Sequence, residues 1–251
     1  MQNRYFGDIG DYGKYSLLRN LCGVHQGTPD LSLGVVWYLF PDEGHNDDGK
    51  HISYLGKPEF RSCDPDLYDA LKHYLSYGIR EVKKIHKSRL FPEDTIFYDK
   101  ILTYEKLYAR DRRTRLKHRD SWILKAVETI GNQDVIFLDP DNGLEVKSVP
   151  IHAPKAPKYV FWDELEKFHS LGKTLVVYHH LNRTLKSREQ IAIKLEEFQN
   201  EIGERPVIPV LFKRGSHRVF FVIPSENHED IIKFRVEKFA QSSWAPHVEA
   251  L

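Results

Sequence analysis

The feature that most constrains the fold is a short apolar run, Val135–Leu138, that leads directly into a group of polar residues. Four apolar residues are too few for a helix, and a proline and a glycine follow closely. Such a run is typical of a strand buried on both faces, which is what a parallel sheet needs. Open α/β sheets bind ligands beyond the carboxyl ends of their strands. The sequence therefore predicts that Asp139, Asp141 and Asn142 lie where chemistry is done.

The rest of the chain alternates between segments with strand spacing and segments with helix spacing. Strands are predicted at 33–39, 95–98, 174–178, 207–212 and 218–223, and helices at 13–21, 66–77, 122–130, 162–168 and 188–202. The last two strands flank a short polar turn, which predicts an antiparallel hairpin at or near the sheet edge. We therefore expect an α/β fold with a doubly wound, mostly parallel sheet and an antiparallel strand in a C-terminal hairpin. Residues 1–251 are expected to form a single α/β domain, in which 78–120 is a candidate inserted or irregular segment.

Composition limits the partners and the location more than the reaction. The 251 residues, of which 41% are hydrophobic, are enough to form one large core. The 37 basic and 36 acidic residues nearly cancel, so any site for a polyanion must be local. The longest apolar runs fall far short of the ~20 residues that cross a bilayer, so no membrane partner is expected. Cys22 and Cys63 are too few for a disulfide scaffold or a thiolate zinc site, which favours a cytoplasmic protein.

Two short motifs accompany this predicted order of elements. Residues 3–5 read Asn-Arg-Tyr and residues 11–15 read Asp-Tyr-Gly-Lys-Tyr, while residues 139–142 read Asp-Pro-Asp-Asn. Together they resemble class I S-adenosylmethionine-dependent methyltransferases, and more closely the bacterial large-subunit ribosomal RNA methyltransferase J family, which modifies adenine N6. Members of that family begin with Tyr-Arg-His, continue with Ala-Asp-x-x-Lys-His into a helix, and carry Asp-Pro-Pro-Tyr after a strand. The resemblance would cover most of the chain.

The resemblance implies a Rossmann-like fold, S-adenosylmethionine as the cofactor, and a nucleic acid, RNA or DNA, whose adenine-type amino group is methylated. On this interpretation Asp139 accepts a hydrogen bond or a proton from the substrate amine, while Asp141 and Asn142 orient the acceptor. The residues that would hold the cofactor are Asp11, Lys14, Tyr15, Gly44, His45 and Asp47.

Two departures from the family pattern lie at these same sites. The turn after the first predicted strand, residues 41–45, is Pro-Asp-Glu-Gly-His, with one glycine where methyltransferases place a glycine-rich turn against the cofactor. In addition, Asp141 and Asn142 replace the proline and the aromatic residue that stacks on an extruded base. A stacking face would have to come from elsewhere in the chain, and Tyr178 and Trp162 are the candidates.

A basic run precedes the predicted helix at 122–130. Residues 110–119 contain six Lys or Arg against one Asp. Such a run can contact nucleic-acid phosphates if it lies beside the cleft, although charge runs are more often solvated surface. The candidates for phosphate contact are Arg112, Arg113, Arg115, Lys117 and Arg119.

The same strand ends allow a second enzyme class. Aspartate and histidine side chains are ligands for divalent metals, and alternation along a strand lets only one of His179 and His180 reach a shared site. A metal-dependent nuclease or phosphoesterase is therefore the alternative, with Asp139, Asp141 and His179 holding Mg²⁺ or Mn²⁺. A non-catalytic binding module on the same fold is the third hypothesis, and residues 139–143 could also form no more than a turn.

Overall fold

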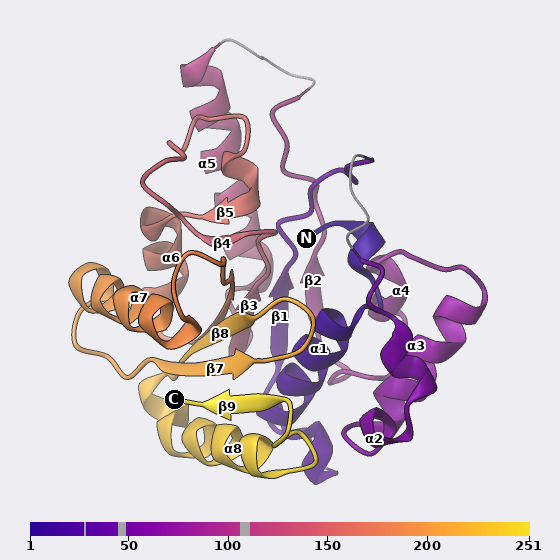
Figure 1. Ribbon diagram of the computed structural model, residues 1–251. Coiled ribbons are helices and arrows are strands. Elements are labelled where there is room, and N and C mark those ends of the chain that lie inside the picture. The colour runs from indigo at the N-terminus through magenta and orange to yellow at the C-terminus, as the bar shows by residue number, and fades with distance from the viewer. Residues whose placement is uncertain (28, 45–48, 106–110) are drawn as a thin grey trace.

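The computed structural model describes residues 1–27, 29–44, 49–105 and 111–251. Its main sheet has seven strands in the order β2-β1-β3-β6-β8-β7-β9, with helices on both faces (Figure 1). A second, two-stranded parallel sheet consists of β4 (Gly143–Leu144) and β5 (Tyr159–Val160). Five of the seven strands of the main sheet point in the same direction, because only β8 and β9 run antiparallel to the others. The predicted α/β fold with a mostly parallel sheet is therefore confirmed at this level.

The parallel part of the sheet consists of strands whose sequences are nearly continuously apolar, as burial on both faces requires. These strands are β1 (Leu33–Val36), β2 (Ile96–Tyr98), β3 (Val135–Leu138) and β6 (Thr174–His180). β1 lies between β2 and β3, and β6 lies on the other side of β3. The chain leaves β1 in one direction to form β2 and returns to form β3 on its other side. The crevice between the ends of β1 and β3 is therefore the topological switch point, where open α/β sheets bind their ligands.

The C-terminal hairpin lies near the edge of the sheet but does not form it. β7 (Ile208–Phe212) and β8 (Arg218–Ile223) form the predicted antiparallel hairpin. However, β8 lies inside the sheet, where Arg218 pairs with both His180 of β6 and Phe212 of β7. All of its residues are buried, as expected for an interior strand that carries apolar side chains on both faces. The unpredicted strand β9 (Val248–Ala250) pairs with β7 and forms the edge instead.

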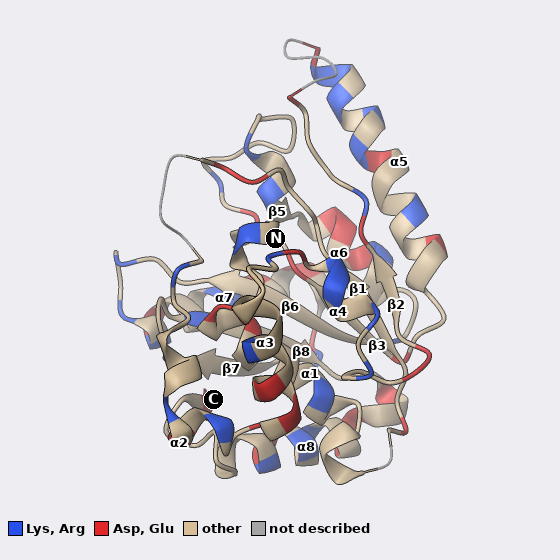
Figure 2. Cartoon of the chain, turned by 90° about the vertical axis from the view of Figure 1, so that its right-hand side faces the viewer, with Lys and Arg blue, Asp and Glu red and all other residues tan. Residues whose placement is uncertain are grey.

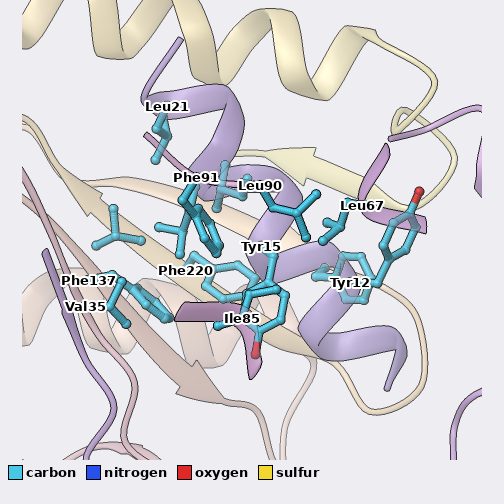
Figure 3. Close-up of a cluster of buried hydrophobic side chains, with 14 of the residues drawn as sticks. Tyr12, Tyr15, Leu21, Val35, Leu67, Ile85, Leu90, Phe91, Phe137 and Phe220 are labelled. Atoms are coloured by element: carbon cyan, nitrogen blue, oxygen red, sulfur yellow. The ribbon is translucent and has the colours of Figure 1, made fainter. Parts of the chain in front are cut away.

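The helices form a layer on each face of the main sheet. They are α1 (Ile9–Leu21), α2 (Pro58–Arg61), α3 (Pro65–Ser76), α4 (Lys83–His86), α5 (Arg112–Ile130), α6 (Trp162–His169), α7 (Ser187–Ile202) and α8 (Glu229–Gln241). One buried cluster includes residues of α1, α3 and α8, and another includes residues of α5, α6 and α7. Figure 3 shows part of the first cluster, which includes Tyr15 and Leu21 of α1, Phe137 of β3 and Phe220 of β8. α2, α4 and α8 were not predicted, and residues 78–120 contain α4, β2 and the first part of α5.

Helix α1 begins at Ile9, earlier than the apolar spacing predicts. The reason is a cap, because the Asp8 carboxylate accepts a hydrogen bond from the amide of Asp11 at 2.8 Å. Every residue of the helix is buried. Gly13 allows it to lie close to the sheet, since a Cβ at this position would be only 2.4 Å from the ring of Phe212. This packing carries the side chain of Lys14 into the interior of the protein.

Within the described ranges, no helix combines the length and the apolar composition that crossing a membrane requires.

Candidate active site

A cavity of about 690 Å³ opens at the carboxyl ends of β3 and β6. Its walls come from the start of α1, the loop after β3, the end of β6 with the loop that follows, and the turn between β7 and β8. The predicted catalytic residues Asp139, Asp141 and Asn142 all line it. Its volume falls within the range of about 300–1,000 Å³ that is usual for small-molecule sites.

A buried lysine joins α1 to the end of β3. Nζ of Lys14 lies 2.7 Å from Oδ2 of Asp139 and 2.8 Å from Oδ1 of Asp11, and all three residues are buried. Burial alone would lower the pKa of Lys14, but the two carboxylates raise it above its ordinary value, so the amine is charged. Burial raises the pKa of Asp139, and Lys14 opposes that rise. Asp11 and Lys14 of the Asp-x-x-Lys motif therefore form one ionic group with Asp139 at the end of β3, although they are far from it in sequence.

The first residue of the chain lies in the switch-point crevice. The Met1 amino group donates to the carbonyl oxygen of Tyr38, just after β1, at 3.2 Å and to that of Asp139, after β3, at 3.1 Å. Burial lowers the pKa of this amino group, although Asp141 and Asp139 attract its proton. The sulfur of Met1 lies 3.7 Å from Nζ of Lys14. An amino group and a thioether are thus accommodated beside the predicted catalytic carboxylate.

Asp141 is held by groups outside the strand. Its Oδ2 accepts a hydrogen bond from Nε2 of Gln2 at 2.7 Å and lies 3.2 Å from Nζ of Lys158. Burial alone would raise the pKa of Asp141, but the Met1 ammonium and Lys158 hold it below its ordinary value. Asp141 is therefore an ionised carboxylate whose position depends on the N-terminal segment.

Two polar groups of the cavity wall retain hydrogen-bonding capacity toward a ligand. Oδ1 of Asp139 accepts no hydrogen bond from the described residues, because Lys14 contacts only Oδ2. Asn142 uses its backbone to bond with Lys158 and His180, and its side-chain amide bonds to none of the described residues. One carboxylate oxygen and one carboxamide are therefore available at the end of β3.

The structure brings together some of the predicted cofactor residues and separates others. Asp11 and Lys14 line the cavity. Tyr15 lies behind them, where its hydroxyl donates to Oδ2 of Asp11 at 3.0 Å. Gly44 is exposed and does not line the cavity. The predictions for His45 and Asp47 fall outside the described residues. The motif on α1 therefore reaches the site, whereas Gly44 does not.

The predicted phosphate-binding run lies elsewhere. Residues 112–119 form the outer end of α5, the part of the helix that extends away from the body of the protein (Figure 2), and no residue of α5 lines the cavity. This applies to the candidates Arg112, Arg113, Arg115, Lys117 and Arg119. Arg119 is in addition fully buried, with its guanidinium paired to the carboxylate of Glu164. Helical periodicity explains the difference, because it turns Arg119 inward while Arg112, Arg113 and Lys117 stay exposed.

The two strand-end histidines point to different sides, as strand alternation predicts. His180 lines the cavity and His179 does not. Instead, Nδ1 of His179 accepts a hydrogen bond from the amide of Leu144 in β4 at 3.0 Å. The alternative metal set of Asp139, Asp141 and His179 is therefore not assembled. More generally, the part of the chain that the structure describes holds no group of three His, Cys, Asp or Glu side chains arranged to bind a metal.

The buried histidine gives a prediction about pH. Burial lowers the pKa of His179 to about 3, whereas the unfolded chain has an ordinary value of about 6.5. Between these values the unfolded chain binds one proton more than the folded protein. The free energy of unfolding is therefore expected to fall as the pH falls below about 6.5, and this group contributes about 1.4 kcal/mol per pH unit.

His179→Asn tests this contribution, since the shorter amide retains an acceptor near Nδ1 and cannot titrate in this range. Urea unfolding at several pH values between about 6 and 4 is expected to give a slope about 1.4 kcal/mol per pH unit shallower than that of the unchanged protein. Equal slopes would mean that His179 is protonated in the folded state.

Several cavity residues were missed by the sequence analysis. The end of β6 and the β7–β8 turn contribute Tyr178, Arg183, Ser216, His217 and Arg218 to the lining. Tyr178 was named only as a candidate stacking face, and its presence in the lining agrees with that role. Of the other four, Arg183, Ser216 and His217 follow predicted strands and Arg218 begins one. The only sequence signal was their position at strand ends, since none of them belongs to a motif.

Comparisons with known proteins add little. No family model matches the chain, and no curated protein matches it. Among solved structures, the chain is similar to protein LPL1258 from Legionella pneumophila str. Philadelphia 1, of the family DUF519, with 14% sequence identity over 98% of this chain and 96% of that one, at a TM-score of 0.45.

Proposed function

We propose that this protein is an S-adenosylmethionine-dependent methyltransferase that acts on an adenine-type amino group of a nucleic acid. The observation that carries the proposal is the end of β3. There Asp139 offers a free carboxylate oxygen and Asn142 a free carboxamide, and both line a cavity of ligand size next to the switch point. An amino group is a hydrogen-bond donor, and these are the acceptors that would recognise it.

The strand order supports the transferase over the other hypotheses. β8 runs antiparallel between β6 and β7, which point in the same direction as each other. A reversed strand inserted in this way belongs to the class I methyltransferase sheet that the sequence resembles. The Asp-Pro-Asp-Asn motif follows β3, the strand next to the switch point. The methyltransferase family that the sequence resembles carries its Asp-Pro-Pro-Tyr motif after a strand in the same way. No corresponding observation favours the nuclease, and fold alone does not separate an enzyme from a binding module.

The residues of the cavity fit S-adenosylmethionine by their chemistry. Asp11 and Asp139 line the cavity beside Lys14, and their carboxylates suit the positive charge of a sulfonium and an ammonium group. Lys14 on the same wall suits a carboxylate. These residues of α1 and β3 would hold the methionyl end of the cofactor, in place of a glycine-rich turn. When bound, the cofactor supplies an electrophilic methyl group.

The chain's own residues would act mainly by positioning. A neutral adenine amino group is a poor nucleophile, so holding it in line with the methyl donor accounts for much of the rate. Oδ1 of Asp139 would accept a hydrogen bond from the amino group, while Lys14 holds Oδ2 and fixes the orientation of the carboxylate. The side chain of Asn142 would accept a second hydrogen bond. Tyr178 in the cavity wall would offer a face for the base.

The first experiment is calorimetric titration with S-adenosylhomocysteine in the presence of a chelator, followed by tritium transfer from methyl-labelled S-adenosylmethionine to adenine-containing RNA and DNA. We expect binding at one site with a Kd of about 1–100 μM. Asn142→Ala is expected to preserve this binding and to slow transfer by about 10²-fold or more, because the acceptor is no longer aligned. Absence of binding with the folded protein would refute the proposal.

A further inference from the structure

The walls of the cavity differ in charge. Among the described residues, four carboxylates line the cavity, those of Asp8, Asp11, Asp139 and Asp141, and they belong to α1, its cap and the loop after β3. The wall formed by the end of β6 and the β7–β8 turn has no lining carboxylate and carries two arginines, Arg183 and Arg218. A ligand that fills this cavity is therefore expected to present donor or positive groups to one wall and an anionic group to the other.

Arg218 is the unusual member of the basic wall. It is the first residue of β8, in the interior of the sheet, and only 7% of its surface is exposed. Its Nε and Nη2 donate to the backbone and hydroxyl oxygens of Ser216, at 3.3 and 3.2 Å. Nη1 donates to none of the described residues, and no described carboxylate lies within 4.0 Å of the guanidinium. Asp8 attracts it only from a greater distance.

A buried guanidinium without an adjacent carboxylate is rare, because a charge is costly to remove from water unless it is paired. The surroundings are shaped to hold the group here. Gly10 leaves room for it, since a Cβ at this position would lie 1.2 Å from Nη1. The ring of Phe212 lies 5.7 Å from the guanidinium carbon on the neighbouring strand. The cavity thus contains a positioned, buried cation with no carboxylate of the described residues within 4.0 Å.

The position of Arg218 in the sheet indicates which part of a ligand it meets. Strands lie about 4.8 Å apart, and β8 is the second strand beyond β3, so the two are separated by roughly 10 Å. The methyl donor belongs at the β1/β3 switch point. An anion at Arg218, whose guanidinium packs against Gly10 near the start of α1, therefore lies roughly two strand spacings from the switch point, and the proposed function assigns it to the acceptor. The planar guanidinium fork matches the oxygens of a phosphate.

We propose that Arg218 forms a phosphate subsite for the methyl acceptor, so that the acceptor is a nucleotide unit rather than a free base or nucleoside. The inference that the ligand is a methyl acceptor rests on the proposed function, whereas the anion subsite rests on the geometry of Arg218 alone. The phosphate can belong to a free nucleotide or to a nucleic-acid strand. The base amino group would meet Asp139 while the phosphate meets Arg218.

The test compares ligands that differ only in the phosphate. Calorimetry with AMP, adenosine and a short adenine-containing oligoribonucleotide is carried out in the presence of S-adenosylhomocysteine, on the unchanged protein, Arg218→Met and Arg218→Lys. The control is Arg214→Met in the same hairpin, whose guanidinium contacts His247 and Pro246 and does not line the cavity. Circular dichroism verifies that each variant is folded. If Arg218→Met does not fold, Arg218→Lys still tests the subsite, because it keeps the positive charge and removes only the guanidinium.

We expect AMP or the oligoribonucleotide to bind about tenfold or more tightly than adenosine, and Arg218→Met to remove this preference without changing adenosine binding. Arg218→Lys is expected to fall between the two, and Arg214→Met to behave as the unchanged protein. If the affinity for AMP depends on Arg218, the phosphate can belong to a free nucleotide. If only the affinity for the oligoribonucleotide depends on Arg218, the phosphate belongs to a nucleic-acid strand.

Equal affinity for the phosphorylated and unphosphorylated ligands, a preference that survives in a folded Arg218 variant, or no binding of any of the three would overturn the subsite. S-Adenosylhomocysteine binding, measured separately, reports on the proposed function. If S-adenosylhomocysteine does not bind but AMP binding depends on Arg218, the phosphate subsite is supported and the methyltransferase proposal is refuted.

Discussion

Replacing Arg119 by methionine is expected to lower the free energy of unfolding by about 3–5 kcal/mol, the range for breaking a buried ion pair from one side. The guanidinium pairs with both oxygens of Glu164 and also donates to the carbonyl oxygens of Ala156, at 2.9 Å, and Tyr159, at 2.6 Å. Glu164 in turn accepts a hydrogen bond from the amide of Phe161, which starts α6. The substitution leaves a buried carboxylate without its cation and removes the Arg119 donor from two carbonyl oxygens.

The matched control is Arg188→Met. Arg188 also pairs with a glutamate, Glu249, but its side chain is 70% exposed. Water replaces the lost contact there, so the expected loss is only about 0–1 kcal/mol. Urea unfolding monitored by tryptophan fluorescence compares the two variants under identical conditions. Similar losses for both would show that the buried pair contributes no more than a surface pair.

Replacing Lys14 by methionine is also expected to lower the free energy of unfolding by about 3–5 kcal/mol at pH 7. The side chain is nearly the same length, so the change removes the charge more than the volume. Asp11 and Asp139 then face each other as buried carboxylates without the cation between them. The pKa of Asp139 in the folded variant rises further, because burial and the Asp11 carboxylate both disfavour its charged form and Lys14 no longer opposes them.

This rise makes the loss dependent on pH. The folded variant binds protons at a higher pH than the unfolded chain does, so its free energy of unfolding increases as the pH falls. The deficit relative to the unchanged protein is therefore expected to be smaller at pH 5 than at pH 7. Adding Asp139→Asn to the variant is expected to restore part of the stability at pH 7. A deficit that does not change with pH, and is not relieved by the second substitution, would indicate lost packing instead of lost charge.

Lys194→Met serves as the control for Lys14. Lys194 is also buried, but its partner Glu197 has a side chain that is 35% exposed and can be hydrated when the cation is removed. We expect a clearly smaller loss of stability for this variant, with little change between pH 7 and pH 5.

The site was partly predictable because its central residues follow local patterns. The run Val135–Leu138 is apolar at every position, and such a strand belongs in the interior of a parallel sheet, so the placement of Asp139 at a carboxyl edge follows from neighbours along the chain. The Asp-x-x-Lys motif also lies within one turn of α1. Its contact with Asp139, across 125 positions, was not predicted, because no local pattern specifies that contact.

The basic run before Trp122 shows where sequence patterns fail. A count of charges treats its arginines as equivalent, but the helix turns Arg119 toward Glu164, which is 45 positions away. Arg218 shows the reverse error, since it belongs to no charge run and yet lines the cavity. Its role depends on β8 lying between β6 and β7, whereas the hairpin pattern specified only that β7 and β8 pair.

The sequence by itself therefore determined the α/β class, most of the regular elements and the polar end of β3, because each depends on the spacing of apolar and turn residues within about ten positions. Only the tertiary structure decided the interior position of β8, the Lys14 group, the burial of Arg119 and the basic wall around Arg218. Each of these depends on which distant segments pack together, and the cost of burying a charge is set by the partners that such packing provides.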